Sequence, residues 1–417
     1  MNHFITRFDI ESSLDSERAV LEDSIMLKGH PATVGSKMLE NFISPLDATV
    51  VERLEANGVT VLGKTKMDEF GARGLFPSIK YPAPGSCEEQ DLVAEVAENA
   101  HSLSADEQKN GHPDLVYHSG AVACVAEGAA EFGLCNDYTG ATSHEAALSG
   151  VCYIRPTYGT VSRYGLIPTV PSMDQIGIVC KTLAQGRRAL SIISGYDQKD
   201  GTMDPDWSQE KADRNCRVEA VKQKTDGGRL LRVGVPTNVL AQIPNSSKVM
   251  DFAGNFDAIE FELKYFDVYA QVKQILCCAE LCNSATRYDG IKFGYRTSGY
   301  RGLHELYTKS RTEAFGSDIK LASIVGSMVL TQEYYLRYYD KAMRVRRLIK
   351  ESLDFGAYDA IVMPESHPSS LALAVHALPG LCGLPAVTAP FRDGGITLIA
   401  GPNREDILFT ALEAVSI

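Results

Sequence analysis

The chain has 417 residues, of which 44% are hydrophobic and 23% charged, and its formal net charge is −12. This composition is typical of a globular protein with a substantial core. The acidic balance argues against a general grip on the phosphate backbone of nucleic acid, which needs clustered Lys and Arg. We therefore expect no direct sequence-specific binding to nucleic acid.

The sequence also lacks the patterns of targeting and membrane segments. Residues 1–20 contain no apolar stretch flanked by basic residues, so we predict no signal peptide. No segment approaches the roughly 20 apolar residues of a membrane span. The ten cysteines include no Cys-x-x-Cys pair. We interpret them, including Cys124, Cys135 and the group Cys277, Cys278 and Cys282, as small buried side chains, and we predict a cytoplasmic protein.

The first half of the chain alternates helical and strand patterns. Residues 47–54 place apolar side chains on one helical face, Gly58 suits a helix end, and residues 59–62 predict a buried strand. Residues 88–114 combine a helix-like patch with a polar loop. The Ala-rich residues 121–130 predict a central helix that packs closely on a sheet.

The second half continues this alternation. Residues 200–228 are polar and charged, which predicts a surface excursion. Residues 341–363 read as a basic helix through Arg347 and Leu348, a break at Gly356 and a strand over 360–363. Residues 396–399 predict another strand, followed by a closing helix from about Arg404. Such alternation indicates an α/β protein, a sheet covered by helices.

A more specific signal lies in two adjacent segments. Residues 135–143, CNDYTGATS, and residues 149–159, SGVCYIRPTYG, together resemble the signature of the amidase-signature family. Further segments resemble one branch of it, the A subunits of the glutamyl-tRNA(Gln) amidotransferases: residues 36–42, 47–51, 63–70, 155–166, 173–177, 287–290 and 335–349.

This resemblance implies the family's fold, a large mixed β-sheet flanked by helices on both faces, as a single domain over residues 1–417. It also implies that the chain is truncated at its N-terminus relative to the family. Residues 88–114 then fall within an insertion.

The family's chemistry depends on a serine nucleophile, a second serine and a lysine base, with backbone N–H groups that stabilise the oxyanion. The resemblance places Ala141 at the nucleophile, Tyr117 at the second serine and Glu22 at the lysine. A methyl group cannot attack a carbonyl. Glu22 has the opposite charge and is expected to be mostly ionised at neutral pH, so it would be a different kind of base from the family's lysine.

The oxyanion turn also departs from the family pattern. The resemblance assigns it to Tyr138, Thr139 and Gly140, where the family has two successive glycines. A β-branched residue resists the positive φ open to glycine. We therefore predict that Thr139 weakens the turn and that the site is vestigial.

Several polar residues near these positions offer substitute chemistry: His118, Ser119, Thr142, Ser143 and His144. A Ser–His pair, Ser119 with His144 or Ser143 with His118, would restore a nucleophile. The alternative is that these groups cap helices or meet water.

Two further groups of residues could bind an ion or a partner. A metal site from Glu365 and His367 lacks a second ligand pair with diagnostic spacing, so we expect no metal and no cofactor. A basic group could form an anion-binding or RNA-binding face, but the acidic chain favours a solvated helix face: Arg337, Lys341, Arg344, Arg346, Arg347 and Lys350.

These observations predict a catalytically inactive paralogue of the amidotransferase A subunits that acts as a structural, regulatory or ligand-binding protein. Its expected partners are amidotransferase-type subunits, a second copy of itself, or a small-molecule amide. The alternative is an enzyme, either a glutamine-hydrolysing A subunit or a rewired serine hydrolase. The sequence leaves open which ligand binds and whether Tyr117 fills the old cleft.

Overall fold

The computed structural model describes residues 3–8, 16–76, 119–208, 211, 224–225, 229–243, 247–365, 369–392 and 394–416. The whole insertion predicted at 88–114, Tyr117, His118 and His367 lie outside the described residues, as does much of the polar segment 200–228.

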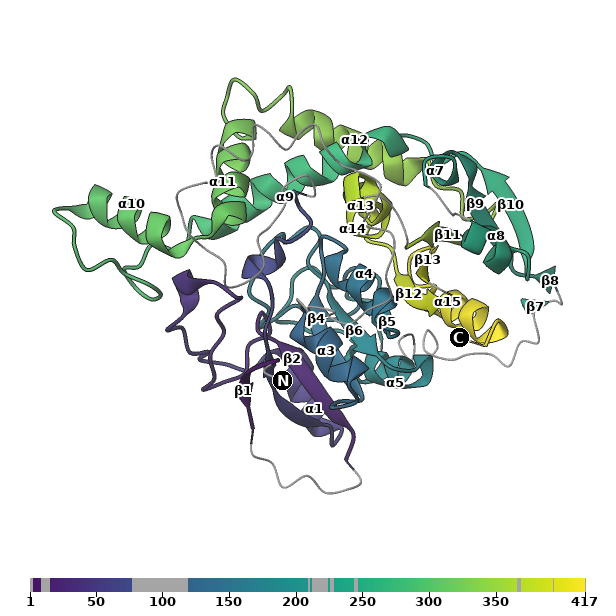
Figure 1. Ribbon diagram of the computed structural model, residues 1–417, viewed down its shortest axis with the longest axis horizontal. Helices are drawn as coiled ribbons and strands as arrows, with labels where there is room; N and C mark the ends of the chain where they lie inside the picture. The colour runs from purple at the N-terminus through teal and green to yellow at the C-terminus, as the bar shows by residue number, and fades with distance from the viewer. Residues whose placement is uncertain are drawn as a thin grey trace, which may run out of the picture.

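One large mixed sheet organises the described part of the chain (Figure 1). Its eleven strands follow the order β1-β3-β2-β4-β6-β5-β12-β13-β11-β9-β10. The strands β2, β3 and β4 pair in parallel, as do β9, β10 and β11, whereas β4, β6, β5, β12, β13 and β11 pair antiparallel. The strand bounds are β1 Phe4–Arg7, β2 Arg18–Glu22, β3 Thr60–Thr65, β4 Phe132–Asn136, β5 Cys152–Arg155, β6 Ile176–Cys180, β9 Arg232–Pro236, β10 Asp257–Phe261, β11 Ala360–Pro364, β12 Ala386–Phe391 and β13 Gly394–Ala400; β7 Lys224–Thr225 and β8 Arg229–Leu230 form a separate pair.

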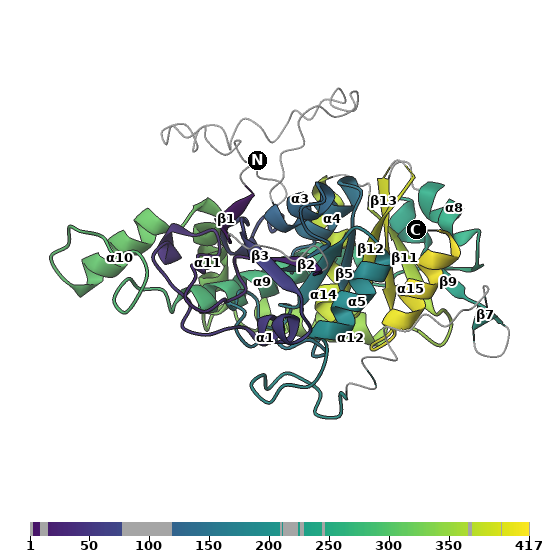
Figure 2. The same cartoon turned by 90° about the horizontal axis from the view of Figure 1, so that it is seen from below.

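Helices connect these strands and surround the sheet, and α10 projects away from it at one end of the molecule (Figures 1 and 2). Their bounds are α1 Thr49–Ala56, α3 Gly120–Ala126, α4 Ala141–Leu148, α5 Leu183–Ile193, α7 Thr237–Leu240, α8 Ser247–Ala253, α9 Tyr269–Ala285, α10 Leu303–Ala314, α11 Ser317–Val329, α12 Tyr339–Glu351, α13 Ser369–Val375, α14 Ala377–Cys382 and α15 Glu405–Ala414. None of the described helices is both long and apolar enough to cross a membrane.

The inner strands are mostly buried on both faces, because each face is covered by helices. In β11, Val362 packs in the core with α1, α5, α8 and α15, whereas the next residue, Met363, packs in the core with α9, α12 and α14. In β2, Leu21 joins the first of these cores and Val20 packs with α3 and α4. Alternate side chains of one strand point to opposite faces of a sheet. The predicted α/β class, with helices on both faces of a mixed sheet, is confirmed.

Most of the predicted elements are present. The helix, glycine and strand expected at 47–62 are α1, Gly58 with φ of 74° and β3. The elements expected from 341 to the C-terminus are α12, β11, β13 and α15. The helix expected over 121–130 is wrong at its end, because α3 stops at Ala126 and Gly128 takes a φ of 75°. All eight described cysteines are buried, as expected.

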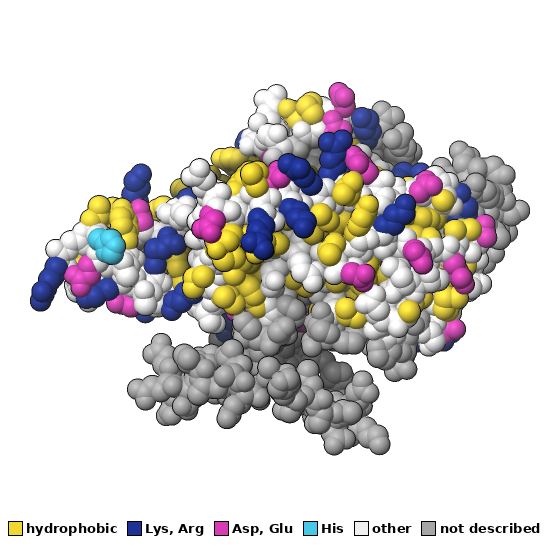
Figure 3. Space-filling model, turned by 90° about the horizontal axis from the view of Figure 1, so that it is seen from above, with side chains coloured by type: hydrophobic (Ala, Val, Ile, Leu, Met, Phe, Trp, Pro, Cys, Tyr) yellow, Lys and Arg dark blue, Asp and Glu magenta, His cyan; other side chains and the backbone are white. Residues whose placement is uncertain are grey.

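The basic group of α12 does not form a continuous positive face. Arg344 pairs with Asp340 and Arg347 pairs with Glu351, at 2.8 and 2.6 Å. Arg346 instead donates to the carbonyl of Leu381 at 2.6 Å and so ties α12 to α14. Figure 3 shows Lys and Arg side chains scattered among apolar and acidic ones on the side that carries α10, α11 and α12. The arrangement fits the solvated helix face better than an RNA-binding surface.

Two leucines test where the core lies. Leu398 of β13 is fully buried, whereas Leu336, between α11 and α12, is 71% exposed. Leu398→Ala removes buried methyl groups and leaves a cavity, so we expect the free energy of unfolding to fall by about 2–5 kcal/mol. Leu336→Ala should change it by less than about 0.5 kcal/mol. Urea denaturation followed by circular dichroism measures both, and equal losses would contradict the assigned core.

Candidate functional site at the β4–α4 loop

The loop Asp137–Gly140 joins β4 to α4 and separates two pockets. The carboxylate of Asp137 accepts two hydrogen bonds from the start of α4, from Gly140 N at 2.7 Å and from Ser143 N at 2.8 Å. A carboxylate at a helix N-terminus satisfies N–H groups that have no partner within the helix. Gly140 has φ of 95°, and a Cβ there would lie 2.2 Å from the Cβ of His376. Glycine is therefore required at this position.

The predicted weakness of the turn at Thr139 rests on a wrong reason. Among the loop residues the positive φ falls on Gly140, and Thr139 does not adopt one. The Thr139 hydroxyl accepts a hydrogen bond from Ala141 N at 3.3 Å. The β-branched side chain therefore caps the turn locally and does not oppose it, so the loop keeps a defined conformation.

The first pocket, which we call the Ala141 pocket, collects residues that the sequence analysis singled out separately. Glu22 comes from the end of β2, Ser119 from the N-cap of α3, and Ala141 and Thr142 from the first turn of α4. The complete lining is Glu22, Met67, Asp68, Gly71, Arg73, Ser119, Asn136, Asp137, Thr139, Ala141, Thr142 and Glu145. Glu22 and Ala141 thus face one space, as the resemblance implies.

Glu22 is buried in an environment that changes its titration. One carboxylate oxygen, Oε2, accepts hydrogen bonds from Ser24 Oγ at 2.5 Å and from Asn136 N at 3.0 Å. Burial outweighs these bonds and raises the pKa of Glu22 from 4.5 to about 7. The expectation that Glu22 is mostly ionised at neutral pH is therefore wrong, because burial could not be inferred from its position in the sequence.

Lys64 of β3 is a buried lysine close to Glu22, but it does not line the Ala141 pocket. Its Nζ donates to the carbonyls of Asp23 and Ile25 and lies 3.6 Å from Asp23 Oδ1. Burial lowers the pKa of Lys64 to about 8. The amine is engaged by these three oxygens, so Lys64 does not take the place of a pocket base.

The serines of the two alternative Ser–His pairs make other contacts in the described residues. Ser119 Oγ caps α3 by accepting from Val122 N at 3.4 Å, and Ser143 Oγ donates to the Gly140 carbonyl at 3.0 Å. His144 Nδ1 lies 3.2 Å from Glu365 Oε2. The pair of Ser143 with His118 cannot be placed, because His118 lies outside the described residues.

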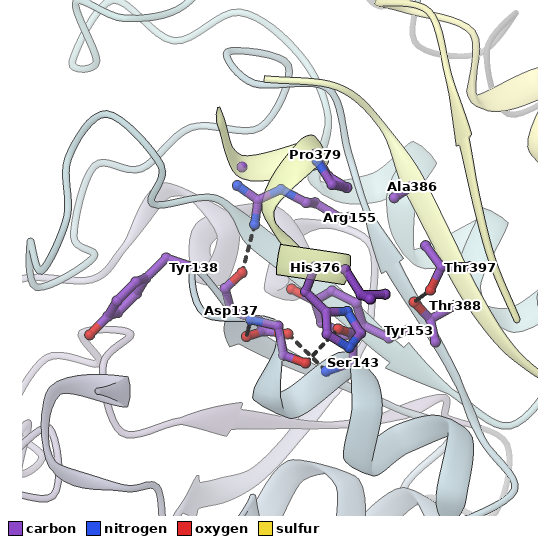
Figure 4. Close-up of a pocket in the computed structure, with 13 residues that line it drawn as sticks. Asp137, Tyr138, Ser143, Tyr153, Arg155, His376, Pro379, Ala386, Thr388 and Thr397 are labelled. Carbon is purple, nitrogen blue, oxygen red and sulfur yellow. Dashed lines mark hydrogen bonds between the residues drawn. The ribbon is translucent and has the colours of Figure 1, made fainter. Parts of the chain in front are cut away.

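The second pocket, which we call the His376 pocket, lies on the other side of the loop (Figure 4). Ser143 and His376 line it with Asp137, Tyr138, Gly140, Tyr153, Arg155, Val375, Pro379, Gly380, Ala386, Thr388 and Thr397. Sequence reasoning missed His376, which follows α13 and has no motif around it. Burial, followed by the neighbouring His144, lowers the pKa of His376 to about 3.

Two buried cations hold the loop from this side. Arg155 donates to the carbonyls of Asp137 and Met173 at 2.7 and 2.6 Å. Lys273 of α9 donates to the carbonyls of Thr139 and His376, both at 2.8 Å. Burial lowers the pKa of Lys273 to about 8. The bonds to Asp137 and Thr139 hold the loop, and those to Met173 and His376 tie the same two cations to neighbouring segments.

Comparison with known proteins gives one consistent result. Residues 19–75 and 118–377 match the family model described as amidase. The chain is 34% identical to the A subunit of glutamyl-tRNA(Gln) amidotransferase from Lachnoclostridium phytofermentans, over 91% of this chain and 76% of that protein.

Solved structures show the same fold. The crystal structure of the glutamyl-tRNA(Gln) amidotransferase A subunit from Thermotoga maritima is similar with a TM-score of 0.68 at 24% identity, over 99% of this chain and 86% of that one. Native peptide amidase from Stenotrophomonas maltophilia is similar with a TM-score of 0.67 at 20% identity, over 95% of this chain and 81% of that one. At these identities the structures support the fold alone.

The titration of Glu22 predicts a pH dependence of stability. Between the ordinary pKa of 4.5 and the folded value of about 7, the folded chain holds a proton that the unfolded chain has lost. Stability therefore falls as pH rises through this range, by about 3 kcal/mol in all, because the pKa rises from 4.5 to about 7 on folding. Glu22→Gln keeps an acceptor oxygen and removes the titration. Relative to the wild type, its free energy of unfolding should rise by up to about 3 kcal/mol between about pH 5 and about pH 8.

Urea denaturation at several pH values measures this difference. Glu55→Gln, on the exposed face of α1, is the matched control and should follow the wild-type pH dependence. If Glu22→Gln and the wild type lose stability in parallel, Glu22 titrates at its ordinary value.

Proposed function

Because the chain belongs to the amidase family, we propose that it retains the family's scaffold, has lost the family's serine-dependent amide hydrolysis, and acts by binding. The observation that carries this proposal is Ala141. It opens α4 at the edge of a pocket that also contains Glu22, at the two positions where the resemblance implies a nucleophile and a base.

The chemistry of the Ala141 pocket supports this proposal. A methyl group offers no lone pair for attack on an amide carbonyl, so no acyl intermediate forms at residue 141. A carboxyl with a pKa near 7 can accept a proton, but one of its oxygens already accepts from Ser24 and Asn136. The hydroxyls of Ser119 and Ser143 hold helix starts. Neither is paired with a base in the described residues.

The same pocket remains suited to a polar ligand. Its lining combines carboxyl groups, hydroxyl groups and Arg73, whose Nη1 lies 3.5 Å from Glu145 Oε2. Such a surface can accept and donate hydrogen bonds to a small amide. The relatives named as amidotransferase A subunits motivate a second role, in which the chain assembles with amidotransferase-type subunits or with a second copy of itself.

The alternative function is catalytic. Identity of 34% to an A subunit of glutamyl-tRNA(Gln) amidotransferase favours a glutamine-hydrolysing protein, and the intact β4–α4 loop is compatible with it. A rewired serine hydrolase would use Ser119 or Ser143. Both versions require a nucleophile other than residue 141.

Hydrolysis by the purified chain separates these functions. We expect no conversion of glutamine to glutamate and ammonia, and no release of ammonia from C-terminal peptide amides, above the rate without protein. Coupled detection of ammonia measures both reactions. Peptide amidase from Stenotrophomonas maltophilia, which has the same fold, serves as the positive control. If the wild type hydrolyses either substrate, the variants show which residues are needed. Activity that remains in Glu22→Gln but is lost in Ser119→Ala or Ser143→Ala would favour the rewired hydrolase over the binding function.

A fluorophosphonate probe tests the serines directly, because it labels only an activated hydroxyl. We expect the folded wild type to be labelled no more than heat-denatured protein. Mass spectrometry of tryptic peptides locates any adduct. Labelling of Ser119 or Ser143 that disappears in the matching Ser→Ala variant would contradict the proposal, whereas equal labelling of both variants would indicate non-specific reaction.

A further inference from the structure

Three metal-ligating side chains meet beside the β4–α4 loop, although they are far apart in the sequence. His144 lies on α4, Glu365 directly follows β11, and His376 lies between α13 and α14. His144 Nδ1 is 3.2 Å from Glu365 Oε2, and His376 Nε2 is 3.3 Å from the same oxygen. All three ligand atoms lie within 4.8 Å of one another.

We propose that His144, Glu365 and His376 bind one divalent transition-metal ion of the zinc class. Two imidazole nitrogens and one carboxylate oxygen form a ligand set that Zn²⁺ accepts, with bonds of roughly 2.0–2.2 Å. In a tetrahedron such bonds separate neighbouring ligand atoms by about 3.3–3.6 Å. The two nitrogen-to-oxygen distances, 3.2 and 3.3 Å, are close to this size. The two ring nitrogens lie within 4.8 Å of each other, so binding requires the rings to come together around the ion.

Burial of the three residues suits an ion that keeps an open position. The side chains of Glu365 and His376 are 0% and 6% exposed, whereas that of His144 is 33% exposed. The ion can therefore enter past His144, and a water molecule can complete the coordination from that side. Three protein ligands with one exchangeable position are typical of zinc sites that bind or activate a further ligand.

Neighbouring groups hold the ligands in place. Thr397 Oγ1 donates to the other oxygen of Glu365 and is itself 2.6 Å from Thr388 Oγ1. Lys273 donates to the backbone carbonyl of His376, and the side chain of His376 packs against Gly140. Hydrogen-bonded second partners of this kind orient metal ligands. A bound metal cation would also stabilise the buried Glu365 carboxylate, because its positive charge offsets the cost of burying a negative charge.

The competing interpretation is a hydrogen-bonded His–Glu–His cluster that uses protons in place of a metal. It predicts no stoichiometric metal binding.

The proposed site is independent of the proposed function, because it uses neither Ala141 nor Glu22, although α4 contributes to both places.

Metal titration of the full, untagged chain tests the site. After dialysis against EDTA, isothermal titration with Zn²⁺ should give one ion per chain, and Co²⁺ should give the d–d absorption of a four- or five-coordinate site. Glu365→Gln and His144→Ala should weaken Zn²⁺ binding by more than about tenfold. Thr397→Val, which leaves all three ligands, should weaken it by about 10- to 100-fold.

A matched control is available at the opposite end of the sequence. His3 Nε2 lies 3.0 Å from Glu127 Oε1 and forms a His–Glu pair, and no group of three metal-ligating side chains includes it among the described residues. His3→Ala should leave the stoichiometry and affinity unchanged. Circular dichroism of the metal-free variants establishes that they are folded.

Two results would overturn the proposal. The first is failure of the wild type to bind one equivalent of Zn²⁺, which requires no variant to interpret. The second is binding that is equally strong in folded Glu365→Gln and His144→Ala, or that is lost in His3→Ala. Thr397→Val separates a loss of Zn²⁺ binding at the site from a loss caused by unfolding, because that change keeps a similar side-chain volume and all three ligands.

Discussion

The geometry of the site depends on the Asp137 carboxylate and its two bonds to the start of α4. These bonds, to Gly140 N and Ser143 N, fix where α4 begins, directly after Gly140 with its positive φ. Arg155 and Lys273 hold the loop from behind through its carbonyls. Because the loop separates the two pockets, the position of Ala141 on one side and of His144 and His376 on the other follows from these contacts.

Local patterns were sufficient to predict many elements but not the sheet. Residues 47–65 read correctly because an apolar helix face, a glycine and a β-rich run are each determined within a few residues. One of the two neighbours of β5 is β12, which pairs Thr388 with Tyr153 across more than half of the chain. Such a pairing is decided by the burial of whole faces, and no local signal records it. The family resemblance, not periodicity, supplied the mixed sheet.

The residues of the candidate site were likewise only partly predictable from the sequence. Glu22 and Ala141 were found because they lie in motifs, and the structure brings both to one pocket. The pKa of Glu22 was misjudged because it depends on burial, which the motif does not encode. The sequence suggests His367, two residues away, as the partner of Glu365, whereas in the structure the Glu365 carboxylate lies against His144 and His376. A separation of 221 residues between His144 and Glu365 leaves no spacing rule to apply.

Retention of the loop and loss of the nucleophile are physically compatible, because they involve different atoms. Every bond that shapes the loop uses a backbone group, the Asp137 carboxylate or the buried cations, and none uses the side chain of residue 141. A hydroxyl there can be lost without leaving any of these groups unpaired. The buried cations are different, because removing Lys273 would leave two buried carbonyls without their donor. The shape of the loop is therefore maintained by the needs of folding, whatever chemistry the pocket performs.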